Sequence, residues 1–314
     1  MNKKAIYNLV KILITILLLY FLLRKIDWIN FLANISGANL LYIIVAALMY
    51  YLGVCVSVAK WQVILREYNL EYSFKKLFDN YLIAGFFNNF LPTSIGGDTY
   101  RFYNLNIQTP NYKKHILSSI LLERGYGFLV IFLVNFFLSL YYINMIMQDR
   151  TLFILQIICW IGFAVIVVFL FLAKKYSTRF FDFLPQISIT NKIKNLLVVL
   201  TDTQCNKTIF LSIFYSLIFT ALVAIARMIL FFSFHYDSIS FSYILYTSTL
   251  LQIFSMVPIS LNSLGVTESL GTFFYSQIGV PGEVSLAIII IGRISAIVTS
   301  SLGGILYIFP KKID

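Results

Sequence analysis

Residues 90–98 read FLPTSIGGD and residues 256–268 read MVPISLNSLGVTE, and both stretches have Pro-x-Ser, then glycine, then an acidic residue. Both interrupt strongly apolar sequence, where proline and glycine break a helix. About one helix later, each is followed by an arginine in apolar sequence, Arg124 after the first and Arg293 after the second. Duplicated broken helices with buried charge can build a transport site at the middle of a bilayer. These two interruptions therefore decide the predicted fold.

The composition is that of an integral membrane protein. The 314 residues are 60% hydrophobic and 12% charged, whereas soluble domains carry about 25% charged residues. Six apolar stretches reach the length of about 20 residues that a crossing needs; they are Ile6–Leu23, Leu40–Ala59, Ile116–Ile143, Leu152–Ala173, Ile209–Phe234 and Ser285–Phe309. The apolar stretches beside the interruptions are shorter, namely Tyr81–Phe90, Tyr243–Val257 and Ser269–Val280. We predict an all-α polytopic membrane protein of about eight apolar segments, with six full transmembrane helices and two re-entrant broken hairpins.

The positions of lysine and arginine predict the topology. If the N-terminus is cytoplasmic and each hairpin returns to its side of entry, 17 of the 24 lysines and arginines are cytoplasmic, Lys60 and Arg101 among them. Positive residues gather on the cytoplasmic side, so we expect a multi-pass protein of the cell membrane with both termini in the cytoplasm. The hairpins then enter from opposite faces and form an inverted repeat. The net charge of +11 follows from this bias, and no nucleic-acid partner is expected.

We expect one transmembrane domain over residues 1–314. Its first half covers about 1–175 and its second half 207–314. They are joined by a cytoplasmic linker over 176–206, in which Ile193, Leu196, Leu197 and Leu200 form one apolar face of an interfacial helix. Three scattered cysteines and two lone histidines lack the spacing of a metal site, so neither a metal nor a cofactor is expected.

The buried charges are the candidate site. Ionisable side chains inside a bilayer usually face a cavity or a partner, and arginine presents a planar fork that suits phosphate. We expect Arg124, Arg227 and Arg293 to contact a lipid phosphate, with Asp98, Glu123 and Glu268 balancing charge. The alternative is an internal ion pair, Arg124 with Asp98 or Arg293 with Glu268, that holds the broken elements in place.

Polar groups at the interruptions complete the predicted site. A half-helix N-terminus inside the membrane offers free N–H groups to an anion. The candidates for headgroup binding are Ser94, Gly96, Gly97, Arg101, Ser260, Asn262 and Ser263. Asn88 and Asn89 are expected to reach the same cavity, or alternatively to bond backbone groups freed by Pro92.

These motifs together resemble a known family. The stretch 89–98 with Arg101, then Glu123-Arg124-x-x-Gly127, then Pro258-x-Ser-x-Asn-x-Leu-Gly-Val-x-Glu268, and finally Arg293 are similar to the flippase-like family, the lysylphosphatidylglycerol synthase transmembrane region. The resemblance covers roughly residues 5–310. It implies a region that, in bifunctional members, moves aminoacylated phosphatidylglycerol between leaflets, while a separate cytoplasmic domain makes that lipid. No lysyltransferase activity is expected here, because the chain ends at Asp314, soon after its last span. Thr267 stands where the family commonly has arginine.

The expected function is a lipid transporter or flippase, an integral membrane protein with membrane lipids as partners. Its substrate would be a phospholipid, an aminoacyl lipid or a polyprenyl-phosphate glycolipid, anionic or phosphate-bearing. A Gly-x-x-x-x-Gly-Lys motif is absent from the sequence, so transport is expected to be downhill or ion-coupled. One alternative is a membrane-embedded transferase, with Glu123, Asp98 or Glu268 as general base. Another is a scaffold that anchors a partner through its basic loops. A homo-oligomer is left open.

Overall fold

The computed structural model describes residues 13, 16–24, 26–90, 96–176, 205–257 and 259–309. Those ranges are helices and their connections, without a β-strand. In lipid every backbone polar group must find its partner within the protein, and a helix achieves this within one segment. The predicted all-α class is therefore confirmed for the described part of the chain.

Five of the described helices are long and apolar enough to cross a bilayer. They are Leu40–Glu67, Pro110–Tyr141, Arg150–Val168, Asn206–Ser233 and Gly282–Ile308. Each overlaps one of the six predicted spans. Half of the remaining predicted span, Ile6–Leu23, lies outside the described residues. A multi-pass membrane protein is thus supported, while the sixth crossing stays a prediction.

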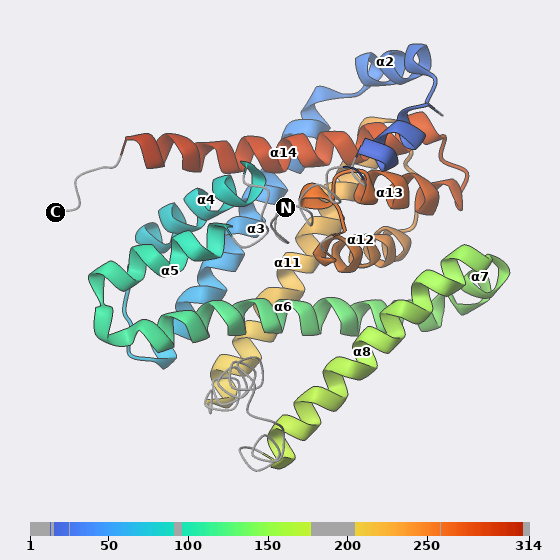
Figure 1. Cartoon of the computed structure of the whole chain (residues 1–314). Coiled ribbons are helices and arrows are strands. Elements are labelled where there is room, and N and C mark those ends of the chain that lie inside the picture. The colour runs from blue at the N-terminus through green and yellow to red at the C-terminus, as the bar shows by residue number, and fades with distance from the viewer. Residues whose placement is uncertain are drawn as a thin grey trace. The chain divides into compact units, whose positions relative to one another are not determined.

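The chain forms two compact units (Figure 1). The first combines Met1–Cys55, Lys75–Arg101 and Ile218–Asp314, and the second combines Val56–Phe74 and Phe102–Leu217. The first unit therefore draws on both ends of the chain and contains both interruptions. The predicted linker over 176–206 lies almost entirely outside the described residues, so the division into two sequence halves stays a prediction.

Helices end at both interruptions, as predicted. In the first unit α4 ends at Phe90 and α5 begins at Gly96, while α12 ends at Met256 and α13 begins at Val266. The helices that contribute to this unit are α2 (Trp28–Gly37), α3 (Leu40–Glu67), α4 (Phe74–Phe90), α5 (Gly96–Gln108), α11 (Asn206–Ser233), α12 (Phe241–Met256), η2 (Leu261–Ser263), α13 (Val266–Ser276) and α14 (Gly282–Ile308). Of these, α3, α5 and α11 continue into the second unit. The elements beside the breaks, α4, α12 and α13, have 17, 16 and 11 residues, shorter than a crossing needs.

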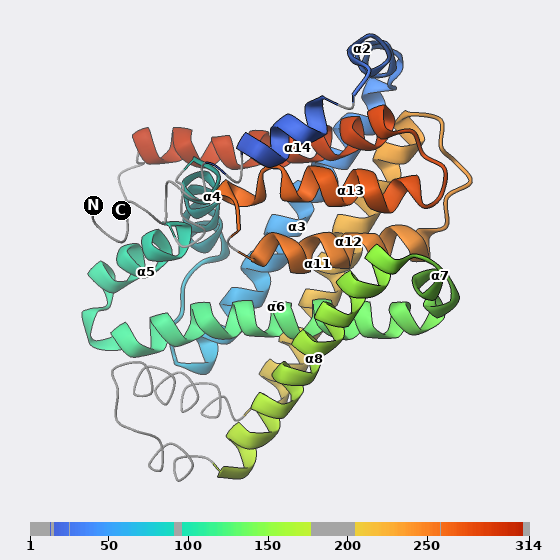
Figure 2. The ribbon, with the colours of Figure 1, turned by 45° about the vertical axis from the view of Figure 1, so that its right-hand side comes forward.

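Helix α14 packs closely against both broken elements (Figures 1 and 2). A Cβ atom placed on Gly303 would lie 2.1 Å from the carbonyl oxygen of Leu82, so α14 and α4 approach backbone to backbone. A Cβ atom on Gly271 of α13 would lie 2.1 Å from Cδ1 of Ile289 in α14. At Gly303 a side chain would prevent this backbone contact, and at Gly271 a side chain would require Ile289 to move.

The second unit is joined by hydrogen bonds between side chains of neighbouring helices. It contains η1 (Pro110–Tyr112), α6 (Lys113–Tyr141), α7 (Ile143–Gln148) and α8 (Arg150–Tyr176), with parts of α3, α5 and α11. Trp61 Nε1 donates to Ser119 Oγ at 3.0 Å, which links α3 to α6. Trp160 Nε1 donates to Ser139 Oγ at 2.8 Å, which links α8 to α6. Polar side chains can hold apolar helices together in this way.

Candidate functional site

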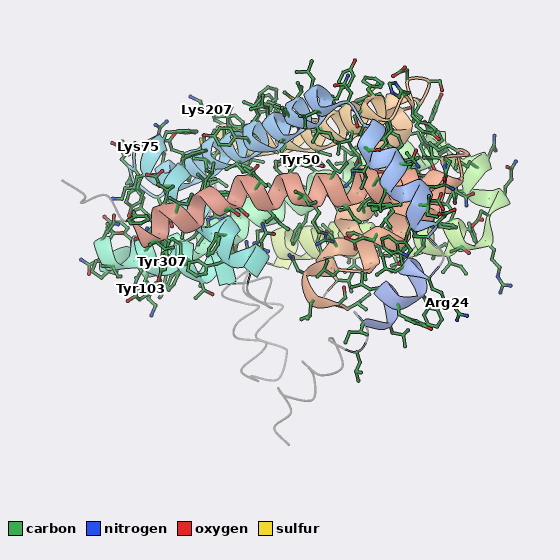
Figure 3. The ribbon with its side chains drawn as sticks, turned by 90° about the horizontal axis from the view of Figure 1, so that it is seen from above. Arg24, Tyr50, Lys75, Tyr103, Lys207 and Tyr307 are labelled. Carbon is green, nitrogen blue, oxygen red and sulfur yellow. The ribbon has the colours of Figure 1, made fainter. Side chains whose placement is uncertain are left out.

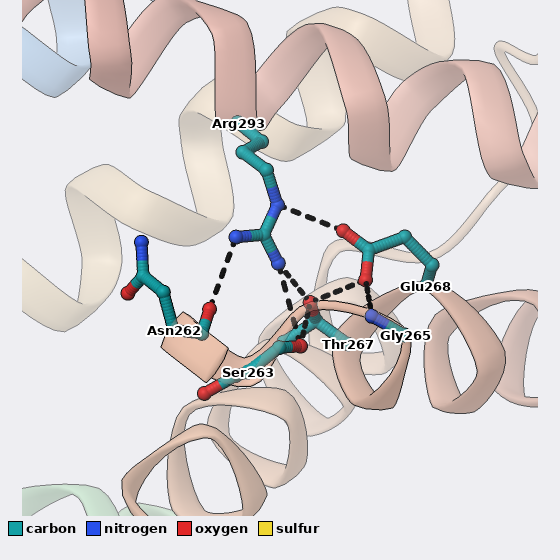
Figure 4. Close-up of polar contacts among 6 residues, drawn as sticks. All are labelled: Asn262, Ser263, Gly265, Thr267, Glu268 and Arg293. Carbon is teal, nitrogen blue, oxygen red and sulfur yellow. Dashed lines mark hydrogen bonds and ion pairs between the residues drawn. The ribbon is translucent and has the colours of Figure 1, made fainter. Parts of the chain in front are cut away.

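Arg293 of α14 clamps the turn between α12 and α13 (Figure 4). Its Nε donates to Glu268 Oε1 at 2.7 Å, and the Glu268 side chain is 4% exposed. Nη1 donates to the carbonyl oxygen of Asn262 at 3.1 Å, and Nη2 donates to Thr267 Oγ1 and, at 3.5 Å, to the carbonyl oxygen of Ser263. All three guanidinium nitrogens thus serve one turn. The ion pair weighed as an alternative is present, and the contact of Arg293 with a headgroup stays a prediction.

The clamped turn has an unusual backbone. Asn262, Ser263 and Gly265 have φ angles of 46°, 57° and 81°. This left-handed region is disfavoured by roughly 1–2 kcal/mol for a residue that carries a side chain. Ser263 Oγ donates to the carbonyl oxygen of Ser255 at 2.6 Å, and Glu268 Oε2 accepts from the Gly265 N–H at 2.7 Å at the start of α13. These contacts hold the strained turn in place.

The first interruption is held by two asparagines. Asn88 Oδ1 accepts from the backbone N–H of Gly97 at 2.8 Å, which ties the end of α4 to the start of α5. A Cβ atom on Gly97 would lie 2.2 Å from the carbonyl oxygen of Ala84, so this contact requires glycine. Asn89 Nδ2 donates to Ser300 Oγ of α14 at 2.7 Å. Asn88 therefore bonds a backbone N–H at the start of α5, and a bond to backbone groups freed by Pro92 stays a prediction.

The start of α5 carries an ion pair within the same helix. Arg101 Nη1 lies 3.5 Å from Asp98 Oδ1, and the Arg101 guanidinium carbon lies 4.6 Å from the centroid of the Tyr81 ring. Asp98 stands in the first turn of α5, where the helix dipole favours an acid. Arg101 is only 3% exposed. It is thus buried in the first unit, although the topology prediction treated it as one of the cytoplasmic cations.

The second unit contains a buried cation that the sequence analysis did not select. Lys60 Nζ lies 3.3 Å from Glu123 Oε1 and donates to the Glu123 carbonyl oxygen at 3.0 Å and to Ser216 Oγ at 3.3 Å. The topology prediction placed Lys60 in the cytoplasm because the apolar run that precedes it ends at Ala59. In the structure α3 continues to Glu67 and Lys60 is buried within the protein, while its side of the membrane stays a prediction. The sequence feature that predicts this burial is the apolar Ile64, four residues later, because residues i and i+4 share a face of a helix and Ile64 is buried.

The two other predicted arginines lie in different units. Arg124 follows Glu123 on α6 in the second unit and is half-buried. Arg227 lies on α11 in the first unit, is also half-buried, and its Nη1 donates to Ser248 Oγ at 3.3 Å. The first unit therefore contains Arg227 and Arg293 together with both interruptions.

The remaining candidates are small polar residues. Ser260 is 4% exposed, and its hydroxyl has no hydrogen-bond partner among the described residues. Gly96 is the first residue of α5. Ser94 lies outside the described residues. A headgroup contact at each of them stays a prediction.

Comparison with known proteins gives one family. The family model described as "Lysylphosphatidylglycerol synthase TM region" matches residues 8–304, nearly the whole chain. Among curated proteins, none matches the chain.

Proposed function

Because this chain belongs to the lysylphosphatidylglycerol synthase TM region family, we propose that it moves a lipid between the two leaflets of a cell membrane. The substrate class is a phospholipid, an aminoacyl-phospholipid or a polyprenyl-phosphate glycolipid. Its headgroup would cross through polar groups of the first unit while its tails remain in the bilayer. The proposal includes the inverted repeat, with both termini in the cytoplasm.

The observation that carries this proposal is that one helix bonds both broken elements. Ser300 of α14 accepts a hydrogen bond from Asn89 beside the first interruption, and Arg293 of α14 pairs with Glu268 beside the second. Residues seven apart lie on the same face of a helix, about 10 Å apart along its axis. The two breaks in the membrane helices are therefore anchored to a common face. This arrangement supports a passage between them, because broken backbone at membrane depth needs protein or a watery cavity around it.

The clamp suggests how a headgroup can be received. The Arg293 side chain is 22% exposed and its partner Glu268 is 4% exposed, so the arginine is the accessible member of the pair. Because all three nitrogens of Arg293 already bond the turn, Arg293 would contribute its positive charge beside the passage while Glu268 keeps the turn in place. Polar candidates beside it are the hydroxyl of Ser260, which has no partner among the described residues, and the side chain of Asn262. Movement of the broken hairpins against α14 would then expose the headgroup to one side and then to the other.

The test is lipid movement in proteoliposomes. Phosphatidylglycerol with a fluorescent headgroup is placed in both leaflets, and dithionite quenches only the outer one. We expect liposomes with the protein to lose clearly more than half of the signal and protein-free liposomes about half. Loss limited to half with correctly folded protein would overturn the proposal. Mass spectrometry of the extracted lipids is the second readout, because a changed lipid mass would point to the transferase alternative.

A further inference from the structure

Arg227, which is half-buried, differs in its charge balance from the other cations enclosed by the helices. Lys60 pairs with Glu123, Arg101 with Asp98 and Arg293 with Glu268. Among the described residues the hydrogen-bond partners of Arg227 are neutral hydroxyls, those of Ser248, Tyr50 and Tyr275, and none is a carboxylate. A cation inside a membrane protein that lacks an acidic partner marks a place where an anion is expected.

Tyrosine hydroxyls surround the same guanidinium. The phenols of Tyr50 in α3 and Tyr275 in α13 both interact electrostatically with Arg227. The Tyr275 ring packs edge-on against Phe231, with ring centroids 4.8 Å apart, and Phe231 lies one turn beyond Arg227 on α11. Tyr275 therefore lies against the face of α11 that carries Arg227.

The Tyr275 hydroxyl is buried beside Thr247 and Arg227 without a well-aligned hydrogen bond to either. Its side chain is fully buried, and its oxygen interacts with Thr247 and Arg227 but forms no hydrogen bond of ordinary geometry with a described residue. A buried hydroxyl left unsatisfied is unfavourable, and native structures usually satisfy it with protein, water or a ligand. A cation without an acidic partner and a buried hydroxyl without a well-aligned hydrogen bond thus lie together among the described residues of the first unit.

The hydroxyl of the second phenol packs closely against a glycine. A Cβ atom on Gly292 of α14 would lie 3.0 Å from the hydroxyl oxygen of Tyr50. Tyr50 lies between α3 and α14 (Figure 3). Gly292 directly precedes Arg293, so this hydroxyl lies at the level of the clamp on α14.

We propose that Arg227, together with the hydroxyls of Tyr50, Ser248 and Tyr275, binds a phosphate or phosphate-ester anion. The guanidinium offers a planar fork to two phosphate oxygens, and hydroxyls donate to the others. Arg293 is less suited to this task, because all three of its nitrogens already serve the turn. That the anion is the headgroup of a transported lipid rests on the proposed function, whereas the anion site itself does not.

Ligand binding and stability in detergent test the site without transport. The wild-type protein is titrated separately with phosphatidylglycerol, diacylglycerol and inorganic phosphate, and thermal unfolding and native mass spectrometry are recorded. The test variants are Arg227→Met and Tyr275→Phe. Their matched controls are Arg150→Met and Tyr103→Phe, because both of these side chains are exposed. Tyr103 points outward on α5 (Figure 3).

The variants should lose lipid affinity without losing stability in the lipid-free state. Lipid-free Arg227→Met should unfold at the same temperature as wild type or higher, because it removes a buried charge without an acidic partner. Phosphatidylglycerol should stabilise the wild type and both controls, while diacylglycerol should not. Arg227→Met should bind phosphatidylglycerol about tenfold to a hundredfold more weakly, and Tyr275→Phe about tenfold more weakly, because hydrogen bonds to a charged group are lost.

Other results would distinguish failure of the anion site from failure of the transport proposal. If inorganic phosphate alone stabilises the protein through Arg227, the anion site stands and the lipid substrate of the proposed function fails. If binding depends on Arg227 but proteoliposomes show no lipid movement, the site again stands and the transport proposal fails. Phosphatidylglycerol binding that is equal in wild type and Arg227→Met, with phosphate binding also unchanged, would overturn the site.

Discussion

Replacing Arg293 by methionine removes the cation of the α14 clamp and leaves the Glu268 carboxylate buried. The Glu268 side chain is 4% exposed and loses a 2.7 Å hydrogen bond, while the carbonyl oxygen of Asn262 loses its 3.1 Å donor. Removing one member of a buried pair typically destabilises by about 3–5 kcal/mol. Arg293→Met should therefore lower the free energy of unfolding by about 4 kcal/mol.

Glu268→Gln should have a smaller effect. The glutamine amide oxygen can still accept from the Gly265 N–H, and the Arg293 side chain is 22% exposed, so solvent can partly compensate its charge. We expect a loss of about 2 kcal/mol. The double variant contains neither charge, so it should lose less than the two single variants together, with a coupling energy of about 2–3 kcal/mol.

The assay is reversible unfolding of the four proteins in dodecyl maltoside micelles by added dodecyl sulfate, followed by circular dichroism. All four points of the cycle are measured in the same detergent. Additivity of the two substitutions within about 0.5 kcal/mol would refute the clamp, because independent sites add to that extent.

Two further predictions concern packing and the second ion pair. Gly303→Ala should destabilise by about 1–3 kcal/mol in the same assay, since its Cβ would lie 2.1 Å from the Leu82 carbonyl oxygen; Gly37→Ala, which meets nothing within 4 Å, should change stability by less than about 0.5 kcal/mol. Equal effects of these two substitutions would contradict the close α14–α4 contact. Lys60→Met should lose about 3–5 kcal/mol, and adding Glu123→Gln should restore part of it, because the second change removes the charge left buried. A double variant less stable than Lys60→Met would show that the pair is not coupled in this way.

The sequence was sufficient to predict the helices and their breaks because both signals are local. Apolar length identifies a span, and Pro92 or Pro258 beside glycine identifies a break. The described helices end at both breaks, and five of them fit predicted spans. The helix α2 over Trp28–Gly37 was not predicted, because its start depends on the cap by Asp27 rather than on length.

The roles of the charged residues could not be separated from the sequence alone. Arg227 and Arg293 both read as arginine in apolar sequence, yet one bonds a neutral serine and the other is fully engaged by a turn. That difference depends on backbone carbonyl oxygens, which no residue type reveals. Thr267 illustrates the same point. The resemblance implies an arginine at this position, whereas here the Thr267 hydroxyl accepts from Arg293, which supplies the cation beside Glu268 from another helix.

The burial of Lys60 could have been predicted from the sequence. The apolar run stops at Ala59, but Trp61, Ile64 and Leu65 continue a helical pattern, and all three are buried. Lys60 shares that face and is therefore enclosed with them. A count of charges by segment treats such a lysine as solvated, so the positive-inside prediction needs this periodicity as a second criterion.

The most direct measurement is the rate at which headgroup-labelled phosphatidylglycerol crosses proteoliposome membranes containing wild type, Arg227→Met or Arg150→Met at equal protein density. If lipid passes through the first unit beside α14, wild type and Arg150→Met move it at the same rate, and Arg227→Met is slower by at least about tenfold. Equal rates in all three proteins, with Arg227→Met correctly folded, would mean that the headgroup does not travel by this route.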